Sequence, residues 1–151
     1  PYPQGLVLEN TFTSISDVVN ALFPMLAFES LKKRFLRIRW ESIQRVQDLE
    51  VPMLFLTGEK DEMIPPTHSR MLHARAEKSR LRRNVVFAEG QHNDTWEKGG
   101  EEYWQAQATF LQECLAQTGS KTVLASKEAK KSSAEAKPEE GWETVASKDE
   151  R

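Results

Sequence analysis

The chain opens with a short apolar run, and similar runs return twice further along. All three are of strand length and rich in Val, Leu or Phe, and turn residues follow each of them: residues 5–9, 51–57 and 84–88. Such runs predict buried strands. Segments with apolar residues at near-helical spacing lie between and after them, so strand and helix alternate. This alternation predicts an α/β fold with a parallel sheet and right-handed crossovers.

Capping residues, prolines and glycines mark the start or the end of several predicted helices. The helical pattern occupies four segments: 17–23, 43–49, 67–80 and 99–117. Thr13, Ser14 and Ser16 precede the first segment as possible caps. Pro66 favours a helix start just before the third segment, since proline is well tolerated in a first turn. Gly119 is the expected stop of the last helix.

From about residue 118 the character of the sequence changes. Lys, Glu, Ser and Ala dominate there, with seven basic and seven acidic residues. Residues 118–151 are therefore predicted to be a charged low-complexity tail that is mostly disordered, and residues 1–117 to be the folded part. Trp142 interrupts the tail and is interpreted as making a transient contact. The alternative is a short linear motif for a protein partner.

Composition excludes several kinds of site. The formal net charge of −2 gives no overall attraction to nucleic acid or to an anionic membrane surface. Cys114 is the only cysteine, which excludes an intrachain disulfide and the usual zinc patterns, and which fits a reducing, intracellular location. No apolar run approaches the roughly 18 residues that span a bilayer. We expect neither a metal nor a cofactor.

Three strands are few for a free-standing parallel sheet, which needs covered faces and protected edges. The chain also runs from Pro1, without a methionine, almost directly into its first strand. We therefore expect further strands of the same sheet upstream of residue 1. We also expect poor stability of the 151 residues alone, because their core is only part of a sheet.

Two polar residues follow the last two predicted strands. Asp61 comes just after the second strand and His92 just after the third. Ligands bind at the carboxyl ends of parallel strands, and neighbouring strands lie about 4.8 Å apart, so we expect the two loops to bring Asp61 to His92. A carboxylate that accepts from one imidazole nitrogen leaves the other nitrogen free as a base, as in a catalytic triad.

Other candidates are weaker. Asp94 is an alternative acid, but it lies only two residues from His92. His68 and His73 are five residues apart on a predicted helix, whereas metal-binding pairs prefer a spacing of four, so both are interpreted as solvated. Trp96 is a candidate substrate contact that lines an acyl pocket, or else it covers the sheet.

Three stretches resemble the bud-emergence (BEM-type) branch of the α/β-hydrolases: L-V-L-E-N-T-F-T-S-I, V-P-M-L-F-L-T-G-E-K-D-E-M-I-P-P and H-N-D-T-W. The order of Asp61 before His92 also matches the Ser, Asp/Glu, His order of that fold. The resemblance covers roughly residues 1–117. It implies the C-terminal part of an α/β-hydrolase sheet with Asp61 as triad acid and His92 as triad base. Members are often anchored at a membrane by an N-terminal segment, so the resemblance implies that the complete protein associates with a membrane through a segment upstream of residue 1.

The nucleophile of the family pattern is absent. No G-x-S-x-G occurs in the 151 residues, and Ser14 and Ser16 lack the flanking glycines of such a turn. We therefore expect a serine hydrolase that acts on an ester or thioester through an acyl-enzyme, in the form of an N-terminally incomplete chain that is inactive alone. The alternatives are a non-catalytic protein-binding module, which uses the sheet edge, the basic segment Lys32–Arg39 or the tail, and an incomplete gene model.

Overall fold

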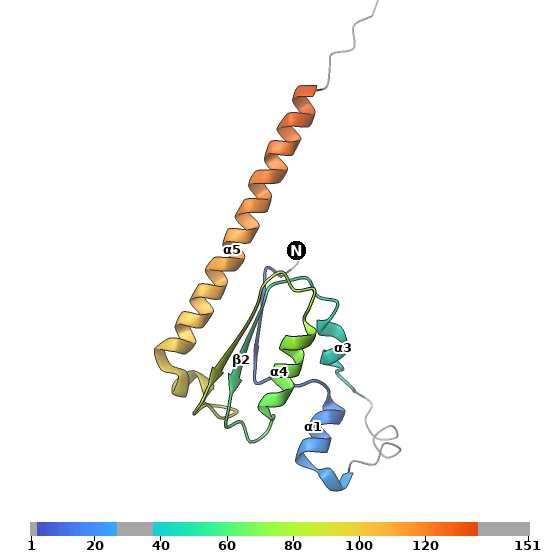
Figure 1. The fold of residues 1–151 in the computed structure, drawn as a ribbon, viewed down its shortest axis with the longest axis vertical. Coiled ribbons are helices and arrows are strands. Elements are labelled where there is room, and N and C mark those ends of the chain that lie inside the picture. The colour runs from blue at the N-terminus through green and yellow to red at the C-terminus, as the bar shows by residue number, and fades with distance from the viewer. Residues whose placement is uncertain (1–2, 27–37, 136–151) are drawn as a thin grey trace, which may run out of the picture. The chain divides into compact units, whose positions relative to one another are not determined.

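The computed structural model describes residues 3–26 and 38–135, and side chains as far as residue 117. The elements follow in the order β1 (Leu6–Glu9), α1 (Ile15–Leu22), the short 3-10 helix η1 (Pro24–Leu26), α3 (Ser42–Val46), β2 (Met53–Gly58), α4 (Pro66–Arg75), β3 (Arg82–Phe87) and α5 (Thr95–Glu135). Strands and helices alternate, which confirms the predicted α/β fold (Figure 1).

The three strands form one parallel sheet in the order β1-β2-β3. Leu6 of β1 pairs with Met53 of β2, and Met53 pairs in turn with Arg82 of β3. All six residues of the central strand β2 are buried. A continuous apolar run is typical of a parallel strand that is covered on both faces.

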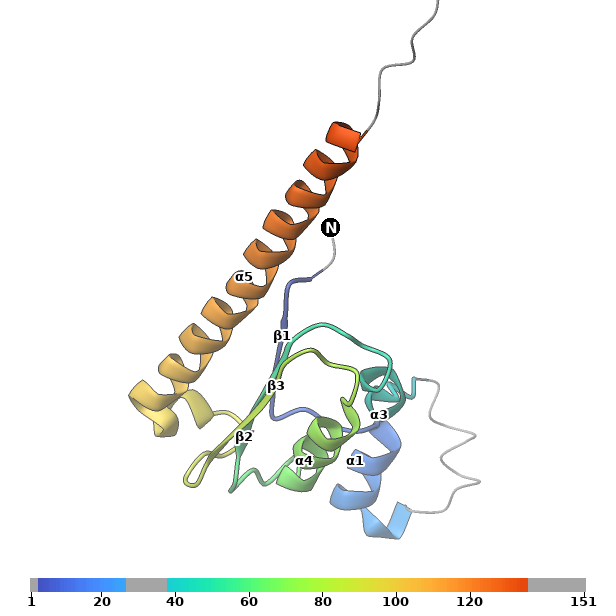
Figure 2. The same cartoon turned by 45° about the horizontal axis from the view of Figure 1, so that its top comes forward.

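Helices cover the two faces of the sheet. One face packs against the first part of α5 through a buried cluster: Leu54, Leu56, Phe87, Tyr103, Phe110 and Cys114. The opposite face packs against α3 and α4 through a second cluster: Val46, Met53, Phe55, Leu72 and Ala76. Neighbouring β2 residues alternate between the clusters because side chains along a strand point to opposite faces. Figure 2 shows α3 and α4 on the side of the sheet away from the first part of α5, up to residue 117.

Two helix starts follow from the sequence signals. The Ser14 hydroxyl accepts a hydrogen bond from the Asp17 backbone N–H at 3.1 Å, which makes Ser14 the N-cap of α1. Pro66 is the first residue of α4. Ser14 is thus the one of the three possible caps that is used, and the expected helix start at the prolines is confirmed, because both signals depend only on neighbouring residues.

The helix at the C-terminal side is longer than expected. α5 starts at Thr95, turns at Gly100 (φ 50°, ψ −129°) and continues through Gly119 to Glu135, so the predicted stop at Gly119 is wrong. One glycine costs a helix only about 1 kcal/mol, and Ala116, Lys121 and Ala125 within two turns of it are strong helix formers. By its contacts the chain divides into two compact units, residues 1–117 and 118–151.

Some expectations lie at the limits of the described chain. Residues 136–151, including Trp142, are outside it, as is most of the basic segment 32–39. Of the helices that are described, none has both the length and the apolar character needed to cross a membrane.

The outer side of β1 is open in the described part of the chain, where β2 is its one strand partner. Next to it lies a hollow of about 490 Å³, whose lining includes Leu6, Leu8, Trp40 and Val46. This hollow belongs to the face that α3 and α4 cover.

Candidate acid–base site

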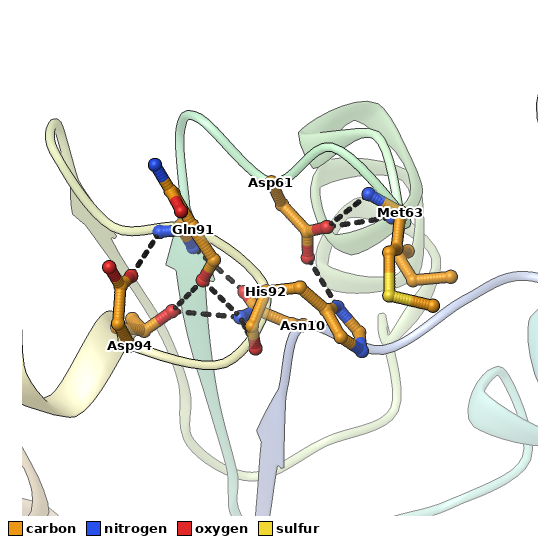
Figure 3. A network of polar contacts seen from close by, with 9 residues as sticks. Asn10, Asp61, Met63, Gln91, His92 and Asp94 are labelled. Carbon is orange, nitrogen blue, oxygen red and sulfur yellow. Dashed lines mark hydrogen bonds and ion pairs between the residues drawn. The ribbon is translucent and has the colours of Figure 1, made fainter.

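Asp61 and His92 meet at one end of the sheet. Asp61 follows β2 and His92 follows β3, and these strands are adjacent and parallel. Oδ2 of Asp61 lies 2.9 Å from Nδ1 of His92 (Figure 3). The expected juxtaposition of these two side chains is therefore present.

The acid is held by its own loop. Oδ1 of Asp61 accepts hydrogen bonds from the backbone N–H groups of Met63 at 2.8 Å and Ile64 at 2.7 Å. Only 1% of the Asp61 side chain is exposed. One carboxylate oxygen thus fixes the loop, and the other is directed at the imidazole, as Figure 3 shows.

The other nitrogen of the His92 ring is free to act as a base. In the part of the chain that the structure describes, Nε2 has no hydrogen-bond partner, and a quarter of the side chain is exposed. If Nδ1 carries the proton and donates it to Asp61, Nε2 presents its lone pair to solvent. This is the arrangement a histidine needs to remove a proton from a substrate or a nucleophile.

Asp94 has a different task. Its Oδ1 accepts from the backbone N–H of Gln91 at 2.7 Å, and its backbone oxygen accepts from Glu97 and Lys98 at the start of α5. These bonds shape the loop that carries His92. The alternative of Asp94 as the acid finds no support, because the carboxylate on the imidazole is that of Asp61.

Two glycines let the acid loop and the base loop approach each other. A Cβ atom on Gly58 would lie 2.6 Å from the backbone oxygen of Gly90, and a Cβ on Gly90 would lie 3.1 Å from the Gly58 Cα. The loops are also joined by a hydrogen bond of 2.9 Å from Lys60 N–H to the Gly90 oxygen. Side chains at these positions would push the loops apart.

Asn10, at the end of β1, was missed in the sequence and is the third component of the site. It has a φ of 41°, is 7% exposed, and its amide bonds to both loops. Asn is enriched in this left-handed region, so an Asn directly after a predicted strand was the available signal. Its side-chain partners lie between 48 and 85 residues away, and no local pattern identifies them.

Of the two helical histidines, His68 is buried, so its interpretation as solvated is wrong, whereas His73 is only partly buried. His68 is 7% exposed, and its Nδ1 lies 2.8 Å from Oγ1 of Thr13. Burial lowers the pKa of His68, although the carboxylates of Asp17 and Asp61 act in the opposite direction. His73 is half-buried with its ring edge-on to Phe55, and burial lowers its pKa too.

The remaining candidates differ in their surroundings. Trp96 lies in the first turn of α5 and is 49% exposed, so its suggested contact with an acyl group stays a prediction. Ser14 is committed to capping α1, and its hydroxyl donates to Asp17. Among the described residues, no cluster of three or more potential ligands fits a metal ion.

Comparison with known proteins finds relatives that are 38% to 41% identical to this chain. No protein-family model matches the sequence. The chain is 41% identical over 118 residues to the alpha/beta hydrolase domain-containing protein WAV2 of Arabidopsis thaliana, with 72% of this chain and 38% of WAV2 covered. It is 38% identical over 110 residues to protein bem46 of Schizosaccharomyces pombe, with 72% of this chain and 35% of bem46 covered.

Two further comparisons concern an uncharacterized relative and a solved structure with low sequence identity. An uncharacterized membrane protein of Saccharomyces cerevisiae is 39% identical over 112 residues, with 71% of this chain and 36% of that protein covered. The acylaminoacyl peptidase of Pyrococcus horikoshii (uncomplexed) matches with a TM-score of 0.47 and 12% identity, over 70% of this chain and 18% of the peptidase chain. The chain thus spans little more than a third of the length of WAV2, bem46 and the Saccharomyces protein.

Proposed function

The chain belongs to the bem46-type branch of the α/β-hydrolases, and from this premise we propose that Asp61 and His92 are the acid and the base of a serine-hydrolase triad. The observation that carries the proposal is the 2.9 Å contact between Asp61 Oδ2 and His92 Nδ1, with Nε2 left without a partner among the described residues. A buried carboxylate in this position fixes the tautomer in which Nε2 is the base.

The reaction we propose is the hydrolysis of an ester or thioester in two stages. His92 Nε2 takes the proton of a serine hydroxyl as the serine oxygen attacks the acyl carbon, and the protonated ring then gives that proton to the departing alcohol or thiol. In the second stage His92 takes a proton from water as the water oxygen attacks the acyl carbon. The bond from that carbon to the serine oxygen then breaks, the ring returns the proton to the serine oxygen, and the acid is released. Asp61 orients the ring and stabilises its charged form in both stages.

The nucleophile and the donors for the oxyanion lie outside residues 1–151 in this proposal. Because the 151 residues contain no G-x-S-x-G, we infer that they hydrolyse esters no faster alone than a chain without His92. Trp96, half-exposed four residues after His92, is the side chain we propose for contact with the substrate.

The proposal is tested on the protein as cells make it, captured through a tag placed after Arg151 and treated with a fluorophosphonate. We expect an intact mass above the 17.3 kDa of this chain and a label on a serine outside residues 1–151. Asp61→Asn should reduce the labelling rate by about 10³- to 10⁴-fold, because an amide at that position favours the wrong imidazole tautomer.

Asp94→Asn is the matched control. It makes the same chemical change two residues from His92 and keeps an oxygen that can accept from Gln91, so the labelling rate should stay near that of the wild type. Equal effects of the two substitutions would refute the role of Asp61. A captured protein of 17.3 kDa without label would instead favour the non-catalytic alternative, a module that binds a protein partner.

A further inference from the structure

Asn10 sits where the three strands of the sheet end. It follows Glu9, the last residue of β1, and its backbone N–H donates to the Leu56 oxygen at 3.0 Å, which extends the pairing of β1 with β2 by one step. Its φ of 41° then turns the chain away from the sheet. The side chain is left inside the molecule, between the ends of β2 and β3.

The Asn10 amide bonds to both loops of the candidate site. Its Oδ1 accepts from the Gly58 backbone N–H at 2.8 Å, at the start of the loop that carries Asp61. Its Nδ2 lies 3.1 Å from the Gln91 oxygen and 3.0 Å from the His92 oxygen, in the loop that carries His92. Figure 3 shows Asn10 at the end of β1, beside the segment that carries Gln91 and His92.

Thr95 completes this set of bonds. Its hydroxyl accepts from Asn10 Nδ2 at 2.8 Å and donates to the Gln91 oxygen at 2.7 Å. Thr95 is fully buried. The two N–H protons of Asn10 are thus shared among three oxygens, and all three belong to the loop from Gln91 to Thr95.

We propose that Asn10 is a positioning residue for the His92 ring, which it holds against Asp61 by fixing the backbone of His92 relative to Gly58. The relevance of Asn10 to catalysis rests on the proposed role of His92 as a base. The hydrogen bonds of Asn10 to the two loops are independent of that role. The acid loop and the base loop each have their own internal bonds, and Asn10 is a side chain that bonds directly to both.

Few other residues meet the demands of this position. Aspartate would place a carboxylate oxygen next to the three oxygens that accept from the Asn10 amide, and these oxygens would repel it. Alanine would remove all four side-chain hydrogen bonds. Glutamine would add a methylene group in a buried position. The left-handed φ also disfavours most residues other than glycine, asparagine and aspartate. Asn10→Asp is therefore the sharpest variant, since it keeps both the shape and the backbone conformation.

The test measures the tautomer of His92 in the full 151-residue chain by ¹⁵N NMR of the imidazole, without substrate or nucleophile. In the wild type we expect the Nδ1–H tautomer, held by Asp61. In Asn10→Asp and Asn10→Ala the tautomer ratio should move about tenfold towards Nε2–H, as expected when a hydrogen bond of ordinary strength is lost. Unchanged His92 resonances in folded Asn10 variants would overturn the proposal.

Asn84→Ala is the matched control. Asn84 is an asparagine of β3 whose Oδ1 accepts from the Thr57 hydroxyl at 3.2 Å, so its loss perturbs the sheet without touching either loop. We expect wild-type His92 signals from it. A shift as large as that of the Asn10 variants would mean that general loosening of the sheet moves the ring, and would also overturn the proposal.

A second pair of variants decides the matter if both Asn10 variants fail to fold. Thr95→Val removes the hydroxyl that links Asn10 to the His92 loop, and Thr95→Ser keeps it. We expect the tautomer ratio to shift in Thr95→Val and to be restored in Thr95→Ser, and equal spectra would count against the proposal. Because no reaction is measured, a failure of the proposed hydrolase activity leaves these outcomes unaffected.

Discussion

His68 lies inside the molecule although its neighbours in sequence are polar. It occupies the inner side of α4, where Thr13 from the segment after β1 meets its ring. Neither the helix pattern nor the spacing of the histidines predicts this burial, because the partner lies 55 residues away. The same holds for Asn10. The sequence therefore does not reveal the role of a residue when its partners lie far away in the chain.

The burial of His68 makes the stability of the fold depend on pH. Its pKa in the folded chain lies below the ordinary 6.5, so the unfolded chain binds the proton more readily. The contribution of His68 is complete above pH 6.5 and is lost as the pH falls through the lowered pKa. We therefore predict that the free energy of unfolding, measured by urea denaturation, falls below pH 6.5, and falls less in His68→Gln.

His73→Gln is the comparison variant, since burial lowers the pKa of His73 as well. In His73→Gln the free energy of unfolding should still fall below the ordinary histidine pKa, because the contribution of His68 remains. If His68→Gln keeps the full dependence of the wild type, His68 is not the group responsible.

Element ends were predicted best where the signal is local. Ser14 and Pro66 begin α1 and α4 as expected, whereas β3 starts at Arg82, two residues before the predicted strand. The early start follows from pairing, because Arg82 and Arg83 lie opposite Met53 and Leu54 of β2. Two arginines do not read as a strand until the partner strand is known.

The contact between the loops after β2 and β3 is a property of two elements together, and Gly58→Ala tests it. The new methyl group would lie 2.6 Å from the Gly90 oxygen and 2.9 Å from the Gln91 oxygen, both of which are backbone atoms with little freedom to move. We predict a loss of about 2 kcal/mol in the free energy of unfolding, together with a change in the His92 imidazole signals, as the loops separate.

Gly5→Ala is a useful contrast to Gly58→Ala. Its methyl group would meet Cys114 Sγ at 2.9 Å and the Phe110 ring at 3.2 Å, which are side-chain atoms that can shift. It should destabilise the chain less and leave the His92 signals unchanged. A Gly58→Ala chain with wild-type stability would show that the two loops do not need their close approach.

At the scale of the whole molecule, helices cover both faces of the sheet, but its two edge strands have no further strand partner among the described residues. Both faces of β2 are buried, yet within the described residues β1 and β3 each pair on one side only. A hollow of about 490 Å³ also opens beside β1. The α/β class and the strand order along the chain follow from hydrophobic patterning, but patterning within 151 residues does not show what completes the sheet.

This architecture predicts a broad, low-temperature thermal transition for the isolated 151 residues, because a small core with open edges gains little from folding as a unit. The same experiment on a chain that ends at Gln117 tests the proposed boundary between the folded part and the tail. Residues 118–151 form a separate compact unit, so their removal should leave the transition where it is. A sharp cooperative transition would contradict the first expectation, and a clear fall of the midpoint on truncation would show that the tail stabilises the fold.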